Sequence, residues 1–184
     1  AAMSPQSEET PLRPDSPYAI TKTAGMHTVR FYRNQFSVFA CSGVLYNHES
    51  RLREHRFLSR KITQAVHDIR AGRAQELVLG DLSAEVDWGY APDYVDAMKR
   101  ILEAAEPDDY VIATGKKHTV QDFVQIAFEC AGLSWKDFVR ENSKVVTRRK
   151  YPLIGDASKL SVLTGWKPSV DFRGMIQELM KGEA

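Results

Sequence analysis

The chain has 184 residues, of which 43% are hydrophobic and 27% charged, and its net charge is +1. This balance is typical of an ordinary globular protein with one sizeable core or two small lobes. The weak charge predicts no nucleic-acid partner, and the short apolar runs predict no membrane-spanning helix. The two cysteines, Cys41 and Cys130, lie outside any C-x-x-C motif, so we expect buried free thiols, a cytoplasmic location and no metal site.

The first predicted helix follows Ser16, a favourable N-cap residue, and has Pro17 at its first position, where a missing N–H costs nothing. It extends to about residue 34, with Ala19 and Val29 on its buried side. Residues 37–45 (SVFACSGVL) then form a nearly continuous apolar run. Such a run predicts a strand that is covered on both faces.

The rest of the chain alternates between short apolar runs and helical patterns, after a polar loop at residues 47–56. Asp93 and Thr119 are predicted helix caps, and Asp122 makes only a partial capping box, because the usual residue there is Glu or Gln. Strands are predicted at residues 77–79 and 110–113, and helices at residues 57–70, 94–105, 119–131, 156–164 and 172–181. Strands that alternate with helices predict an α/β fold.

Tyr18 and Lys22 are the strongest chemical pair in the sequence. At positions i and i+4 of the first helix they lie on one face, one turn apart. An ammonium group beside a tyrosine favours the phenolate, and such a pair can accept a proton from a hydroxyl group. The spacing alone is weak support, because Tyr18 could equally be a half-buried aromatic residue and Lys22 a solvated charge.

Several motifs, in order along the chain, carry a resemblance to known enzymes. They are residues 8–11 (EETP), 16–22 (SPYAITK), 43–50 (GVLYNHES), 57–63 (FLSRKIT), 87–95 (DWGYAPDYV), 111–115 (VIATG), 153–159 (LIGDASK) and 165–168 (GWKP). Together they resemble the GDP-mannose 4,6-dehydratase family of extended short-chain dehydrogenases. The N-H-E-S and R-K-I-T segments point to this family rather than to the wider epimerase group.

The resemblance implies the C-terminal part of a Rossmann-type parallel-sheet domain plus a smaller mixed α/β nucleotide-sugar-binding domain. Residues 1–50 and about 90–116 correspond to the NADP-binding domain, and residues 51–89 and 117–184 to the substrate domain. The implied reaction converts GDP-mannose to GDP-4-keto-6-deoxymannose in deoxysugar biosynthesis. In that reaction C4 is oxidised with NADP, water is eliminated across C5 and C6, and the hydride returns to C6.

The resemblance also assigns roles to individual residues. Tyr18 and Lys22 match the catalytic pair, and Lys22 also matches the lysine that holds the nicotinamide ribose. The residues matched to the NADP site are Tyr18, Lys22, Leu45, Asn47, His48 and Arg53. The residues matched to the GDP-sugar site are Asn47, Lys61, Arg148 and Arg149. The structural alternatives are a turn residue at Asn47, a loop histidine at His48, and solvated charges at Arg53 and Lys61.

Three departures from the family pattern affect these expectations. One is that residues 147–152 (TRRKYP) lack the acidic residue that the family often carries there for the nucleotide ribose. Val86 stands where the family has an arginine that grips the diphosphate, a loss that Arg148 and Arg149 could offset. The sequence also contains neither a G-x-G-x-x-G turn for a cofactor pyrophosphate nor the family's serine or threonine and glutamate before the Tyr-x-x-x-Lys helix. We therefore expect a truncated form that cannot run the reaction alone.

Two alternatives stay open on the sequence. One is another NAD(P)-dependent nucleotide-sugar epimerase or reductase, which would share Tyr18 and Lys22 but leaves N-H-E-S poorly explained. The other is a non-catalytic nucleotide-sugar-binding module, which the missing motifs favour. The apolar run at residues 37–45 needs strands on both edges, so we also expect either a homo-oligomer or association with a missing N-terminal piece.

Overall fold

The computed structural model describes residues 4–142 and 152–181. The helices are α1 (Pro17–Phe36), α2 (Leu58–Arg70), α3 (Ala91–Leu102), α4 (Val120–Cys130), α5 (Trp135–Phe138), α6 (Ser158–Thr164) and α7 (Phe172–Met180). The strands are β1 (Ser42–Leu45), β2 (Asn47–Glu49), β3 (Leu77–Leu79), β4 (Glu85–Tyr90), β5 (Asp109–Ile112), β6 (Lys117–Thr119) and β7 (Val139–Glu141). The predicted α/β fold is confirmed. Across the described ranges, no helix has the length and apolar character needed to cross a membrane.

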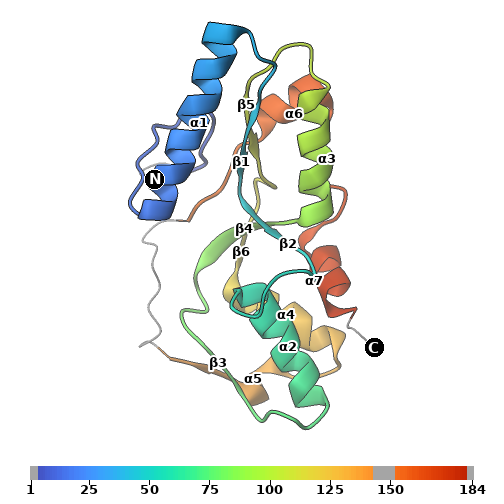
Figure 1. Cartoon of the computed structure of the whole chain (residues 1–184). Coiled ribbons are helices and arrows are strands. Elements are labelled where there is room, and N and C mark those ends of the chain that lie inside the picture. The colour runs from blue at the N-terminus through green and yellow to red at the C-terminus, as the bar shows by residue number, and fades with distance from the viewer. Residues whose placement is uncertain (1–3, 143–151, 182–184) are drawn as a thin grey trace.

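The molecule is elongated and has two regions, which Figure 1 shows one above the other. The upper region contains α1, β1, α3, β5 and α6, and the lower region contains α2, β3, α4, α5, β7 and α7. A three-stranded sheet with the order β2-β4-β6 lies where the two regions meet. Because β2 follows β1 after a single residue, the chain passes directly from the upper sheet into this central one.

In the upper region, β1 and β5 pair in parallel, from Ser42 opposite Asp109 to Leu45 opposite Ile112. Helices α3 and α6 cover one face of this pair with a cluster of buried side chains: Tyr94, Ala97, Ile101, Tyr110, Ile112, Leu160 and Trp166. On α1, Arg30 and Arg33 form ion pairs with the Asp109 carboxylate of β5. These contacts tie α1 to the two-stranded sheet.

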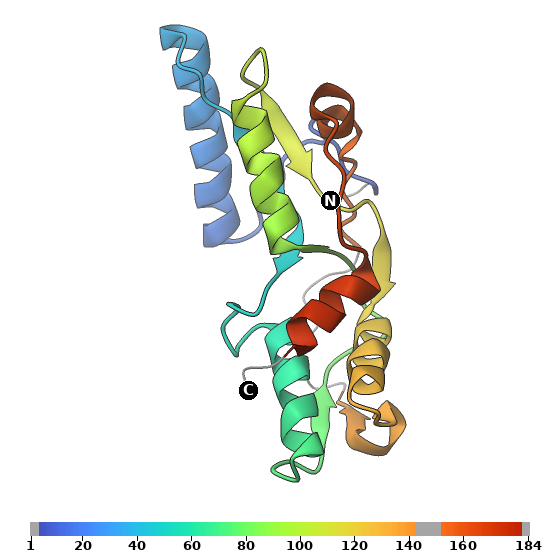
Figure 2. The same cartoon turned by 90° about the vertical axis from the view of Figure 1, so that its right-hand side faces the viewer.

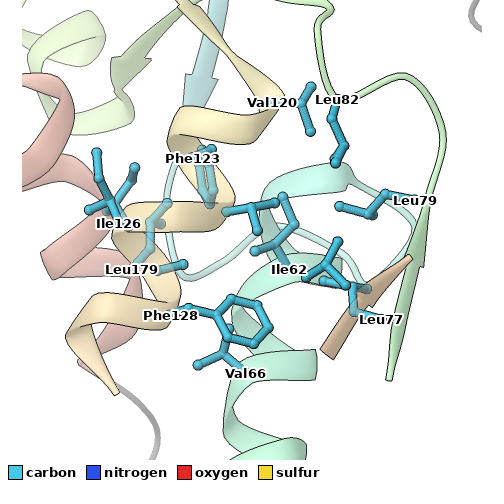
Figure 3. Packing of buried hydrophobic residues seen from close by; sticks show 14 of the residues in the cluster. Ile62, Val66, Leu77, Leu79, Leu82, Val120, Phe123, Ile126, Phe128 and Leu179 are labelled. Atoms are coloured by element: carbon cyan, nitrogen blue, oxygen red, sulfur yellow. The ribbon is translucent and has the colours of Figure 1, made fainter. Parts of the chain in front are cut away.

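The lower region has the larger core. Figure 3 shows Ile62 and Val66 of α2 facing Phe123 and Phe128 of α4, with β3 closing one side. The α7 side chains complete this core from the other side, since Leu179 is only 4% exposed. Burial of this many aliphatic and aromatic side chains is the main favourable term that holds the lower region together.

The predicted helix caps agree with the structure in two of three cases. The Ser16 hydroxyl accepts a hydrogen bond from the Ala19 amide, and Thr119 forms a complete capping box with Asp122. Aspartate therefore serves in the box where only a partial one was predicted. The predicted cap at Asp93 is wrong, because α3 begins two residues earlier and Asp93 is buried in its first turn.

Three predictions about burial and strand length need correction. No residue of α1 is buried, so Ala19 and Val29 are only partly covered. The predicted strand at residues 37–45 is limited to β1, and Phe39 before it is 46% exposed. Neither cysteine is buried, since Cys130 on α4 is exposed and Cys41 is only partly covered, although both thiols are free. An apolar pattern predicts which residues need cover, but nothing among the described residues provides that cover here.

Candidate functional site

Tyr18 and Lys22 lie in the first turns of α1 and their side chains meet. The Lys22 ammonium is 5.5 Å from the centre of the Tyr18 ring. The tyrosine is 72% exposed, so its hydroxyl group is accessible from solvent. The Ser16 cap fixes the start of the helix and hence the position of this pair. An accessible tyrosine can, as the phenolate, accept a proton from a bound hydroxyl group.

Asn47 and His48 lie on β2, immediately after β1 and Leu45. The Asn47 amide donates a long hydrogen bond of 3.4 Å to the main-chain oxygen of Asp87. The His48 ring nitrogen Nδ1 lies 2.8 Å from the main-chain oxygen of Tyr46, and the ring stacks on Tyr94 with centroids 5.0 Å apart. Pairing of β2 with β4 therefore fixes both side chains at the centre of the molecule.

Arg53 is held by a buried acid. Its guanidinium donates to both carboxylate oxygens of Glu49, at 2.9 and 3.3 Å, and lies 3.8 Å from the Phe57 ring centre. The Ser59 hydroxyl donates to the same carboxylate, which is only 4% exposed. Arg53 thus neutralises Glu49 and closes the loop after β2. If Arg53 also contacted a cofactor, its guanidinium would have to do so while it pairs with Glu49 and lies against Phe57.

Lys61 lies on α2, where its ammonium donates to the main-chain oxygen of Val78 at 2.7 Å. This contact holds the ammonium at the end of β3 as an exposed positive charge. Arg148 and Arg149, the other predicted basic residues, lie outside the described residues. No hydrogen bond or ion pair joins Tyr18 or Lys22 to Asn47 or Lys61 within the part of the chain that the structure describes. The predicted residues thus form separate groups on α1, β2 and α2.

Asp87 is a central residue that the sequence reasoning did not single out. It is fully buried, and its carboxylate accepts four hydrogen bonds: from the Thr114 amide (3.0 Å), the Thr114 hydroxyl (2.6 Å), the Gly115 amide (3.1 Å) and the Gly155 amide (3.1 Å). It thereby joins β4 to the turn after β5 and to the segment before α6. Its place in the D-W-G motif, between two residues that face the opposite side of the strand, was the signal for an inward-facing acid.

The N-terminal segment is attached at the same centre. Gln6 forms a bridge with Gly155, and the Tyr46 hydroxyl lies 2.7 Å from the side-chain oxygen of Gln6. A side chain at Gly155 would collide with Ala113 and Tyr46, so only glycine allows these segments to approach so closely. The ends of β1 and β5 therefore meet the start of β2 in a tightly connected junction.

Comparison with known proteins decides the family. The family model for GDP-mannose 4,6 dehydratase matches residues 1–179. The chain is 44% identical over 177 residues to GDP-mannose 4,6 dehydratase 2 of Arabidopsis thaliana, covering 96% of this chain and 48% of the relative. It is 36% identical to the Homo sapiens GDP-mannose 4,6 dehydratase over 197 residues, covering 97% of this chain and 53% of the relative.

The chain belongs to the GDP-mannose 4,6-dehydratase family. It spans about half the length of the curated relatives it matches. Among solved structures, RMD from Pseudomonas aeruginosa complexed with NADPH superposes with a TM-score of 0.87 at 18% identity, covering 96% of this chain and 59% of that one. The dTDP-glucose 4,6-dehydratase of Bacillus anthracis in complex with NAD gives 0.84 at 21%, covering 98% and 56%. At these identities the structures show the Rossmann-like fold alone.

Val86 stands at the position where the resemblance to the GDP-mannose 4,6-dehydratase family implies a diphosphate-binding arginine. Val86 is half-buried on β4, opposite His118 of β6, and packs against the lower core. An aliphatic residue at this position adds to the core and offers no donor to a phosphate. Any grip on a diphosphate must therefore come from other residues, of which Lys61 is the described candidate.

Proposed function

We propose that this chain supplies the proton acceptor and part of the nucleotide-sugar site of a GDP-mannose 4,6-dehydratase. The observation that carries the proposal is the accessible Tyr18 side chain, whose ring centre lies 5.5 Å from the Lys22 ammonium, on a helix with a fixed start. In the proposed role Tyr18 accepts the proton of the C4 hydroxyl while hydride leaves the same carbon. In the same role Lys22 donates a hydrogen bond to a ribose hydroxyl.

The proposed cofactor is NADP, which would supply the hydride acceptor. The accessible side chains of Tyr18 and Lys22 fit the nicotinamide-ribose end of such a molecule, since together they offer a hydroxyl and a cation on one face. Leu45 and His48 lie at the junction of β1 and β2, whereas Arg53 is already paired with Glu49. The 184 residues contain no glycine-rich pyrophosphate turn, so we expect the purified chain not to retain NADP.

The proposed substrate is a GDP-sugar, bound by Asn47 and Lys61 together with Arg148 and Arg149. An ammonium group suits a diphosphate as a point charge. Because Val86 removes the family's arginine, binding should be weak. Titration calorimetry with GDP-mannose and UDP-glucose tests the assignment. A preference for GDP-mannose is expected, and equal affinity for both, or none for either at millimolar ligand, would contradict it.

We also propose that the chain associates with another polypeptide, in the cytoplasm, through β1. The amides of Ser42 and Tyr46 donate to the β5 side, at Asp108 and Ile112, so the alternate residues Gly43 and Leu45 direct their amides to the other edge. Within the described ranges no strand pairs with that edge. An open edge beside exposed apolar residues is a template for pairing.

Light scattering combined with intact mass spectrometry tests the association. We expect an oligomer, or a second chain that carries the missing strands of the sheet. A homogeneous 20.8 kDa monomer with no second polypeptide would contradict the proposal.

A non-catalytic nucleotide-sugar-binding module is the second candidate, favoured by the absence of the glycine-rich turn from these 184 residues. The two candidates differ in one observable. Formation of a 4-keto sugar from GDP-mannose requires the catalytic assembly, whereas binding alone does not. We expect no product from the purified chain by itself. In a complete catalytic assembly, Tyr18→Phe should remove most turnover and leave substrate binding nearly intact.

A further inference from the structure

None of the described residues that are proposed above for catalysis or GDP-sugar binding lines a second feature of the molecule, a pocket of about 720 Å³. Its walls are β6 with the turn before it, the first turns of α4, and residues 168–173, which lead into α7. Helices α4 and α7 pack side by side in Figure 2, and the pocket lies beside their N-terminal ends. Small-molecule sites have volumes of about 300–1,000 Å³. The pocket is thus large enough for a small ligand.

The walls are fixed by their own hydrogen bonds. The buried Asp93 carboxylate accepts from the Ser169 amide at 3.1 Å, from the Ser169 hydroxyl and from the Val170 amide at 3.3 Å. The Asp171 side chain caps α7 through the Gly174 amide at 2.7 Å. A pocket whose walls are already ordered loses little conformational entropy when a ligand binds.

Stacked rings form the floor of the pocket. The His118 imidazole lies parallel to the Phe172 ring, with an interplanar angle of 2° and centroids 3.8 Å apart. The Trp88 indole also stacks on Phe172, with ring centroids 5.7 Å apart and an interplanar angle of 19°. Trp88 itself is part of the lower core and only 5% exposed. The stack therefore presents a rigid, mainly apolar surface to the pocket, suited to the C–H face of a saturated ring.

The polar groups of the lining carry balanced charge. Two cations, Lys116 and Arg173, stand among two carboxylates, Asp122 and Asp171. An anionic ligand would meet the carboxylates, and a cationic ligand would meet Lys116 and Arg173. The charge balance therefore favours a neutral ligand over either kind of ion.

Three side chains of the lining have hydrogen-bonding capacity to spare. The His118 ring nitrogens and the Lys116 ammonium make no hydrogen bond within residues 4–142 and 152–181. The Gln125 amide already donates to Glu129 at 2.8 Å, which leaves its oxygen open to a donor. The lining can therefore both donate to and accept from a ligand that carries several hydroxyl groups.

We propose that this pocket binds a neutral polyhydroxylated ring, a monosaccharide unit, independently of the GDP-sugar site. The rings of His118 and Phe172 contact the ring C–H groups, and His118, Lys116 and Gln125 bond to hydroxyl groups. Because few hydrogen bonds and little apolar area are involved, affinity in the millimolar range is expected, about −4 kcal/mol.

The test is saturation-transfer NMR and titration of the intact chain with methyl α-D-mannopyranoside. His118→Phe keeps the stacked ring but loses the ring nitrogens, so binding should weaken by about threefold to tenfold. Lys116→Ala should act in the same direction. Both positions are at least partly exposed, so the lower core should remain intact. Thermal unfolding of each variant verifies that the fold is retained.

The matched control is Asn47→Ala, which lies in the proposed GDP-sugar site. It should weaken GDP-mannose binding and leave methyl mannoside binding unchanged. If the methyl mannoside signal is absent from the wild type, or is lost in Asn47→Ala and kept in His118→Phe, the proposal is overturned. Tighter binding of inorganic phosphate than of methyl mannoside, with competition between them, would equally overturn it in favour of an anion site. Neither outcome depends on whether GDP-mannose itself is bound.

Discussion

The two regions of the molecule treat their apolar residues differently. In the lower region, α2, α4 and α7 bury their apolar faces against one another. In the upper region, α1 buries none of its residues, and Phe31, Tyr32 and Phe36 contact one another on its surface with exposures of 50–62%. The apolar side chains of α2, α4 and α7 are thus covered by one another, whereas α1 keeps exposed apolar surface within the described residues. We therefore expect the upper and lower regions to differ strongly in local stability.

The largest expected effect separates the two regions through one residue type. Phe123→Ala removes a fully buried ring from the lower core and should reduce the free energy of unfolding by about 3–5 kcal/mol. Phe31→Ala on α1 is the control and should cost less than about 1 kcal/mol, because that ring is 53% exposed. Urea unfolding followed by circular dichroism measures both. Equal losses would show that α1 is covered in solution to the same degree as the lower core.

A smaller effect is expected at the junction between the regions. Asp87→Asn replaces an acceptor oxygen by an amino group that faces backbone N–H groups of Thr114, Gly115 or Gly155. At least one of those donors loses its partner, which should cost about 1–3 kcal/mol. Asp96→Asn on the surface of α3 is the matched control and should be nearly neutral. If the two variants unfold at the same urea concentration, Asp87 does not hold the junction together.

Removal of a helix cap should also affect stability differently in the two regions. Thr119→Ala removes half of the capping box of α4, a central helix of the lower core, and should cost about 1 kcal/mol of global stability. Ser16→Ala removes the cap of α1. Because α1 is peripheral, the loss there should be seen mainly as faster hydrogen exchange in its first turn. A larger global loss from Ser16→Ala than from Thr119→Ala would reverse the ranking of the two regions.

The smallest expected effect concerns pH. Burial opposes ionisation of Asp109, but its pairs with Arg30 and Arg33 outweigh this and lower its pKa. The folded state therefore binds a proton less readily than the unfolded chain. The contribution of the ionised Asp109 carboxylate to the free energy of unfolding is complete above about pH 5. This contribution decreases as the pH falls through the ordinary pKa range of an aspartate, near ~4, toward the lower pKa of the folded state. Asp109→Asn should have a shallower loss of stability with acid, measured by urea unfolding across that range.

Much of the fold followed from local sequence signals. Helix starts at Ser16 and Thr119 were predictable because their side chains act within one turn. The strand at residues 77–79 was predictable from its apolar run. The strands β2, β4, β6 and β7 were not predicted, and residues 47–49 of β2 were expected in a polar loop. Strands β2, β6 and β7 have only three residues each, and β4 lies between two partners, β2 and β6, that no local pattern encodes.

The site was predictable only in part. The i, i+4 spacing of Tyr18 and Lys22 predicted their proximity, which the structure shows. The pairing of Arg53 with Glu49 and the four bonds to Asp87 were missed, since they join residues through tertiary contacts that no local pattern encodes. The roles of Tyr18, Lys22 and the other matched site residues in binding and catalysis stay predictions. So does the division into an NADP-binding part and a substrate part.

In the proposed function, Asn47 and Lys61 bind the substrate and Tyr18 transfers the proton. This assignment is tested most directly by titrating GDP-mannose into the wild-type chain, Lys61→Ala and Tyr18→Phe, with Lys99→Ala on the surface of α3 as the charge control. We predict that Lys61→Ala weakens binding by about tenfold, through loss of one charge-assisted contact to the diphosphate, and that Tyr18→Phe and Lys99→Ala leave the dissociation constant unchanged. Wild-type affinity in Lys61→Ala, together with loss of binding in Tyr18→Phe, would contradict it.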